Sequence, residues 1–238
     1  MKRQSSKQSG FTLVEIAIVL VIIGLLLGGV LKGQELITAS KGKALDNDKA
    51  GMQAAFTSYS DRYKAMAGDD PTALTRFTTE QCGGASCVNG TGDGILSGTA
   101  ATFSTATTPT NAAENLLAWQ HLRAANFLKT GELASWSTPR HVSGGRIGVQ
   151  AAQIYNGQNA EATGQIYISL DAVPTNVAQA LDSSVDDGFV NRGVYRGALN
   201  PLNALPGTSY SQGVIAGTGV VSPAAANAAT YVVAAQLY

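Results

Sequence analysis

The stretch S-G-F-T-L-V-E-I-A-I-V-L, Ser9 to Leu20, places a single glutamate, Glu15, inside a run of apolar side chains. No other residue from Phe11 to Leu31 is charged, and a helix of this length spans the roughly 30 Å hydrocarbon core of a membrane. The Leu, Ile and Val residues of the run favour insertion by about 6 kcal/mol, whereas one acidic residue costs about 3 kcal/mol at the bilayer centre. The sequence therefore predicts a transmembrane helix over residues 11–31.

Segment 1–10 indicates how Glu15 could obtain a cationic partner, which an ionisable group in a membrane helix needs. The segment carries Lys2, Arg3 and Lys7, a bias that holds the N-terminus in the cytoplasm, and it ends in Gly10. Cleavage after Gly10 would free an amine on Phe11, one helical turn from Glu15. We expect this amine to meet the Glu15 of a neighbouring copy. An uncleaved signal anchor that holds a periplasmic domain is the alternative.

Gly10, Phe11 and Glu15, between a short basic leader and an apolar helix, resemble the N-terminus of type IV prepilins and type II secretion pseudopilins. The resemblance implies that a prepilin peptidase cleaves between Gly10 and Phe11 and that Phe11 is N-methylated. It also implies that Glu15 pairs with the N-terminal amine of an adjacent subunit during filament assembly. Many family members have a proline at the twenty-second mature position, where this chain has Lys32.

Length and charge limit the number of domains and the kinds of partner that the rest of the chain can have. With 238 residues there is room for one membrane helix and one globular domain, and zero net charge with 13% charged residues gives no nucleic-acid-binding signature. The predicted parts are a cleaved basic leader, the transmembrane half of an N-terminal helix, its periplasmic half, and a globular pilin-like domain. Their predicted ranges are 1–10, 11–31, 32–67 and 68–238.

An apolar stripe predicts that the N-terminal helix continues beyond the membrane and packs on the globular domain. The turn formers Asp69, Asp70 and Pro71 end this helix near Gly68. The stripe consists of Leu45, Met52, Phe56, Tyr59, Tyr63 and Met66.

The globular domain has signals for a second helix and several strands. Asn111 can cap a helix that runs to about Leu128, with Glu114 at the capping-box position. A short helical stretch follows Pro174. Segments rich in β-branched and aromatic residues predict strands at 146–151, 165–170, 189–195 and 230–238. The predicted fold class is α+β, an antiparallel sheet against the long N-terminal helix, which agrees with the pilin-like fold that the resemblance implies.

Cys82 and Cys87 follow the membrane segment, so export would place them in an oxidising compartment where a small disulfide loop is expected. A pair of free thiols is the alternative. No further ligands for a zinc site lie nearby.

Three acidic residues near Gly188 are candidate calcium ligands, since some pseudopilins bind calcium in a late loop. They are Asp182, Asp186 and Asp187, and a solvated turn is the alternative. Asp93, between two glycines, is interpreted as a turn with too few carboxylates for calcium.

The two histidines do not predict an enzyme. Neither His121 nor His141 lies in a recognisable nucleophile motif, and His121 is expected on the exposed face of its helix. No cofactor and no other metal site is predicted.

The sequence predicts a structural subunit of a type IV pilus or pilus-like filament, with a minor pilin favoured. A type II secretion pseudopilin or a membrane-anchored periplasmic binding protein is the alternative. Before assembly the protein would be a single-pass inner-membrane protein with a periplasmic C-terminal domain, and afterwards part of a pilus or periplasmic filament. The predicted partners are the prepilin peptidase, the inner membrane and other pilin subunits.

Overall fold

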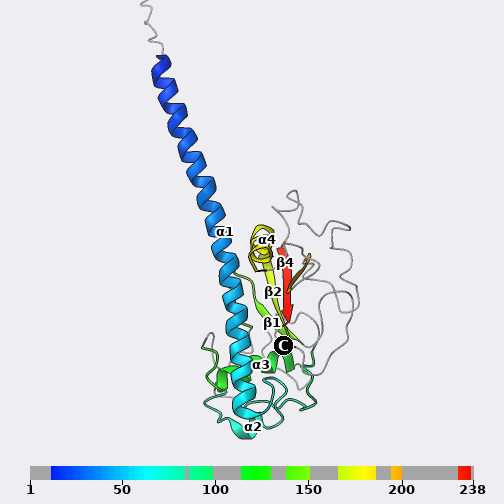
Figure 1. Ribbon diagram of the computed structural model, residues 1–238. Helices are drawn as coiled ribbons and strands as arrows, with labels where there is room; N and C mark the ends of the chain where they lie inside the picture. Colours follow the sequence, from blue (N-terminus) through cyan, green and yellow to red (C-terminus); the bar gives the residue numbers. More distant parts are fainter. Residues whose placement is uncertain are drawn as a thin grey trace, which may run out of the picture. The chain divides into compact units, whose positions relative to one another are not determined.

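The computed structural model describes residues 12–83, 86–98, 114–129, 138–150, 166–185, 194–199 and 230–236. The chain divides into two units, Met1–Thr38 and Ala39–Tyr238. The first described element, α1, is one continuous helix from Leu13 to Tyr63 that runs through both units (Figure 1).

Helix α1 ends at Tyr63, four residues before the predicted end at 67. Lys64 adopts a left-handed conformation with φ of 55°, and its N–H still donates to Ser60 O at 2.8 Å. A residue in this conformation turns the chain away from the helix axis, so the helix stops before the turn formers at 69–71.

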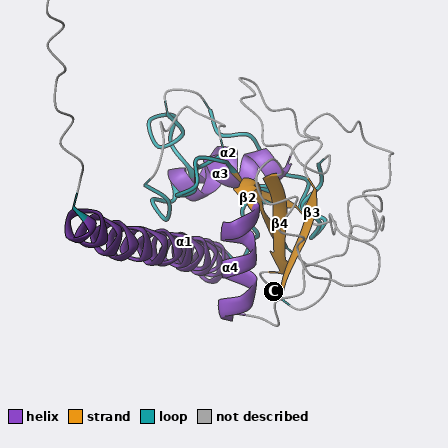
Figure 2. Cartoon of the chain, turned by 90° about the horizontal axis from the view of Figure 1, so that it is seen from above, coloured by secondary structure: helices purple, strands orange, loops and turns teal. Residues whose placement is uncertain are grey.

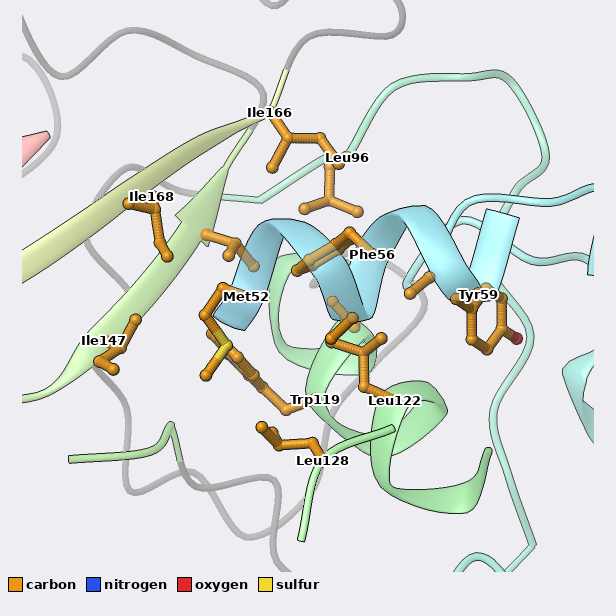
Figure 3. Packing of buried hydrophobic residues seen from close by; sticks show 14 of the residues in the cluster. Met52, Phe56, Tyr59, Leu96, Trp119, Leu122, Leu128, Ile147, Ile166 and Ile168 are labelled. Carbon is orange, nitrogen blue, oxygen red and sulfur yellow. The ribbon is translucent and has the colours of Figure 1, made fainter. Parts of the chain in front are cut away.

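The predicted stripe of α1 is buried as expected. Leu45, Phe56 and Tyr59 are fully buried, Met52 is 8% exposed, and Tyr63 and Met66 pack against the same core. The side chains of Met52 and Phe56 lie among those of Trp119 and Leu122 and the strand residues Ile147 and Ile168, as Figure 3 shows.

The described residues contain three shorter helices: α2 (Ala73–Arg76), α3 (Glu114–Ala124) and α4 (Thr175–Val185). All eleven residues of α3 are buried, which is unusual for a helix with polar residues on every side. Helix α4 follows Pro174 as predicted. A Cβ on Gly42 of α1 would lie 3.0 Å from Leu181 N of α4, so this glycine allows the two helices to approach closely.

In the part of the chain that the structure describes, four strands form one antiparallel sheet, which confirms the α+β prediction. They are β1 (Ile147–Gln150), β2 (Tyr167–Pro174), β3 (Tyr195–Leu199) and β4 (Thr230–Gln236), in the order β1-β2-β4-β3. Figure 2 shows β4 between β2 and β3. The third strand begins at Tyr195, where the predicted strand was expected to end, and residues 189–193 lie outside the described residues.

Strand β2 changes register between Leu170 and Val173. Ala172 lies in this irregularity with φ of 49°, a conformation that costs a non-glycine residue about 1 kcal/mol. Asp171 lies in the same irregularity and contacts Arg146, which directly precedes β1. The N–H of Asp171 donates to Arg146 O at 3.0 Å, and its carboxylate accepts a hydrogen bond from Arg146 N.

Candidate functional site

Glu15 lies in the first turn of α1 and forms a reciprocal capping box with Thr12. Glu15 Oε2 accepts hydrogen bonds from Thr12 N and Thr12 Oγ1, both at 2.8 Å, and Glu15 N donates to Thr12 Oγ1 at 3.3 Å. This arrangement satisfies N–H groups that have no partner within the helix. The T-x-x-E spacing of residues 12–15 is the sequence signal for this cap, and the sequence analysis missed it.

The other residues of the predicted assembly motif, Gly10 and Phe11, lie outside the described residues. Within the part of the chain that the structure describes, Thr12 is the hydrogen-bonding partner of Glu15. The proposed roles of Gly10, Phe11 and Glu15 therefore stay predictions.

The N-terminal part of α1 is uncovered and apolar. It contains a window long and apolar enough to cross a membrane, and none of that window is buried by the described chain. Its large side chains are strongly exposed, with Leu13 at 91% and Leu25 at 74%. Exposure of so much apolar surface in water is unfavourable, so this segment requires lipid or other apolar helices around it.

Cys82 and Cys87 form a disulfide with a Cα–Cα distance of 5.4 Å, as the sequence analysis expected. Both residues are buried, at 1% and 2% exposure. The disulfide fixes the start of segment 86–98. Hydrogen bonds to Glu114 hold the rest of this segment against α3.

Buried carboxylates hold segment 86–98 through its backbone. Asp69 accepts hydrogen bonds from the N–H groups of Gly92, Asp93 and Gly94 at 2.6, 3.2 and 2.8 Å. Glu114 accepts from the N–H and the hydroxyl of both Thr91 and Ser97, at 2.6 to 2.9 Å. Asn111, the other half of the predicted capping box, lies outside the described residues, so the capping role of Glu114 stays a prediction.

These contacts bring three carboxylates together. Ligand atoms of Asp69, Asp93 and Glu114 lie within 4.8 Å of one another. The sequence alone indicates a turn at Asp93 with too few carboxylates for calcium, since Asp69 and Glu114 are distant in sequence. The oxygens of Asp69 and Glu114 already accept several hydrogen bonds from the loop, and this geometry stabilises the loop without an ion.

The predicted calcium candidates are only partly described. Asp182 is 6% exposed and lies in α4, whereas Asp186 and Asp187 lie outside the described residues. The buried, helical position of Asp182 differs both from the late loop of the calcium prediction and from the solvated turn that is its alternative. Calcium binding by the three residues stays untested.

Asp70 is the most heavily hydrogen-bonded carboxylate among the described residues. It is fully buried and accepts from Tyr59 Oη at 2.8 Å, from Thr72 N and Oγ1, and from Arg76 Nε at 2.9 Å. Burial acts to raise the pKa of Asp70, but the hydrogen bonds from Thr72, Tyr59 and Arg76 outweigh it, and the pKa lies below its usual value. The ionised carboxylate thus joins the end of α1 to α2.

The expectation that His121 is exposed is wrong, because its side chain is fully buried. His121 Nδ1 accepts a hydrogen bond from Gly68 N at 2.9 Å, and Nε2 lies 2.8 Å from Val88 O. These partners define a neutral ring with its proton on Nε2. The ring stacks on Tyr59 at a centroid distance of 6.1 Å and joins three segments of the chain.

Burial lowers the pKa of His121, and this effect exceeds the opposing effects of the Val88 hydrogen bond and the negative charges of Asp70 and Glu114. A histidine of the unfolded chain titrates near pH 6.5, whereas folded His121 takes up its proton only at a lower pH. The free energy of unfolding should therefore fall as the pH is lowered from about 6.5 towards the lower folded pKa.

We expect the melting temperature of the full chain in detergent to decrease below about pH 6.5, and His121→Asn to remove most of that pH dependence. The variant is also less stable at neutral pH, because Val88 O loses its donor. Thermal unfolding followed by circular dichroism between pH 5 and 8 measures both effects. An equal pH dependence in the variant and the wild type would contradict this assignment.

His141 is also buried, and none of the described residues places an activated nucleophile beside it. Its Nε2 lies 2.7 Å from Asp171 O, and its Nδ1 accepts from Ser143 N at 3.2 Å. Ser143 Oγ makes no hydrogen bond. General-base activation requires the hydroxyl to contact the imidazole, so these residues do not form a hydrolytic dyad.

Comparison with known families supports the N-terminal motif. Residues 5–31 match the family model described as the prokaryotic N-terminal methylation motif. This is the prepilin motif that type IV pilins and pseudopilins carry, and it lies at the N-terminal end of the given sequence. No curated protein and no solved structure matches the chain.

Proposed function

We propose that this protein is a subunit of a type IV pilus or pilus-like filament, cleaved after Gly10 by a prepilin peptidase and methylated on Phe11. The proposal rests on the position of Glu15, an acidic residue inside an uncovered apolar helix. Glu15 lies within residues 5–31, which match the methylation motif. Its predicted partner is the Phe11 amine of a neighbouring subunit.

The energetics of Glu15 favour assembly over a lone subunit. In one chain, Glu15 contacts neutral Thr12 groups, which satisfy hydrogen bonds without neutralising the charge. A neighbour's ammonium group would neutralise it in a site from which water is excluded, where the attraction between opposite charges is strongest. The capping box then holds the carboxylate in place until a neighbour arrives.

The disulfide supports export of the globular unit. Disulfides form and persist in oxidising compartments, and the Cys82–Cys87 bridge lies on the C-terminal side of the apolar segment. Lys2, Arg3 and Lys7 lie on the other side and favour the cytoplasm. We therefore propose an inner-membrane protein with a periplasmic domain, which leaves the membrane when it enters a filament.

Within this class we propose a minor pilin. The alternatives are a type II secretion pseudopilin and a permanently anchored periplasmic protein. The anchored protein differs in one measurable respect, because it would retain residues 1–10.

We expect Gly10→Val to block processing, because a side chain at this position hinders approach of a protease to the backbone beside the bulky Phe11. The wild-type protein should begin at a methylated Phe11, and the variant should retain its leader in the membrane. Intact-mass spectrometry of both purified proteins measures this, with Ser9→Val as the neighbouring control. A wild-type protein that begins at Met1 would overturn the proposal.

A further inference from the structure

Helix α1 carries one isolated ion pair in its exposed apolar part. Lys32 Nζ lies 2.7 Å from Glu35 Oε2, and the two side chains are 66% and 68% exposed. They are the only charged residues from position 16 to position 40. The side chains of Leu31, Leu36 and Ile37, which flank the pair in the sequence, are 66%, 62% and 59% exposed.

Stabilisation of α1 itself does not account for this pair. Lysine precedes glutamate, which is the less favourable order relative to the helix dipole. A pair with this exposure also contributes little to the stability of a single chain in water. The pair gains importance only if another apolar surface covers it and excludes water.

The pair lies on a different side of α1 from Glu15. At about 100° per residue, Lys32 and Glu35 are about 60° apart and lie about 200° to 260° around the helix from Glu15. A neighbour that contacts Glu15 therefore does not by itself cover the side of Lys32 and Glu35, which is available to a different neighbour.

We propose that Lys32 and Glu35 form a contact with a second copy of this chain, in which Lys32 of one copy pairs with Glu35 of the next. This inference rests on the proposed filament function. The two charges are self-complementary, so parallel copies can exchange their intrachain pair for an intersubunit pair without leaving a charge alone. A charged pair in an otherwise apolar helix surface also specifies the register of neighbouring helices, since other registers bury unpaired charges.

Charge reversal distinguishes an intersubunit pair from an intrachain pair. Lys32→Glu leaves two acidic side chains in each subunit, and Glu35→Lys leaves two basic ones. Expressed alone, each variant should enter sheared filaments at a level roughly tenfold or more below the wild type, because like charges meet between subunits. Expressed together, the two variants should enter mixed filaments at near wild-type levels. Epitope tags and immunoblots of filament and membrane fractions measure each variant.

Controls separate this contact from folding, processing and the proposed function. The double variant Lys32→Glu with Glu35→Lys should assemble alone, and Lys43→Glu, an equal change of charge on an exposed residue of α1, should assemble like the wild type. All variants should reach the membrane and lose their leader normally. If the wild type assembles but co-expression of the two single variants does not restore their incorporation, the pair has an intrachain or lipid-headgroup role. That result would overturn the contact alone. Absence of the wild type from filaments would overturn the proposed function and the contact with it.

Discussion

Substitution of Glu15→Val should remove the protein from filaments and leave its membrane level equal to or above that of the wild type. The change eliminates a charge that opposes membrane insertion, so anchoring is not weakened. In the proposed filament it would leave the neighbour's Phe11 amine buried without a partner, at a cost of roughly 3 to 5 kcal/mol. A cost of this size corresponds to a decrease of about 100-fold or more in incorporation.

Two further variants separate the charge of Glu15 from its capping role. Glu15→Gln removes the charge and retains a side chain that can close the capping box, so it should fail in assembly like Glu15→Val. Thr12→Val removes the hydroxyl that bonds to Glu15 and retains the charge, and its defect should be much smaller. Quantitative immunoblots of sheared filaments and inner membranes compare the variants. Equal incorporation of Glu15→Gln and the wild type would assign Glu15 to helix capping alone.

Substitution of Asp70→Ala should destabilise the globular unit by roughly 3 to 5 kcal/mol, because it leaves the buried Tyr59 hydroxyl and the Arg76 guanidinium without their acceptor. Urea unfolding of the full chain in detergent, followed by tryptophan fluorescence, measures the change. Asp61→Ala is the matched control, since Asp61 is exposed on α1 and its loss should change stability by less than about 0.5 kcal/mol.

The contribution of Asp70 should also depend on pH with a defined sign. Its folded pKa is depressed, so its stabilising effect is present above the unfolded pKa of about 3.8 and is lost as the pH falls through the folded value. The difference between wild type and Asp70→Ala should therefore shrink in strong acid. A constant difference down to pH 2, or a loss no larger than that of Asp61→Ala, would contradict the role of Asp70.

The proposed assembly residues and the disulfide were predictable because their signals are local. Glycine, phenylalanine and glutamate occur at fixed spacing beside an apolar run, and Cys82 and Cys87 are only five positions apart. The capping box of Thr12 and Glu15 was equally local and was missed only because Glu15 was interpreted for its charge. The roles of Gly10 and Phe11 depend on a peptidase and on neighbouring subunits, which a single chain does not contain.

Elements whose periodicity and composition extend over many consecutive residues were predictable from local patterns. These were the long helix α1, its buried stripe, the short helix after Pro174 and most of the strands. Hydrophobic periodicity predicts which side of an element is buried. Turn formers predict where the element ends to within a few residues.

Contacts between segments that are distant in sequence were not predictable and follow from the folded structure. The insertion of β4 between β2 and β3 depends on pairing across long stretches of chain, which local patterns do not encode. His121 appeared to be a surface residue because histidine is polar, yet Gly68, 53 positions earlier, and Val88, 33 positions earlier, satisfy both of its ring nitrogens. A polar side chain can be buried when its partners are supplied, and partners that lie far along the chain become visible only after the chain has folded.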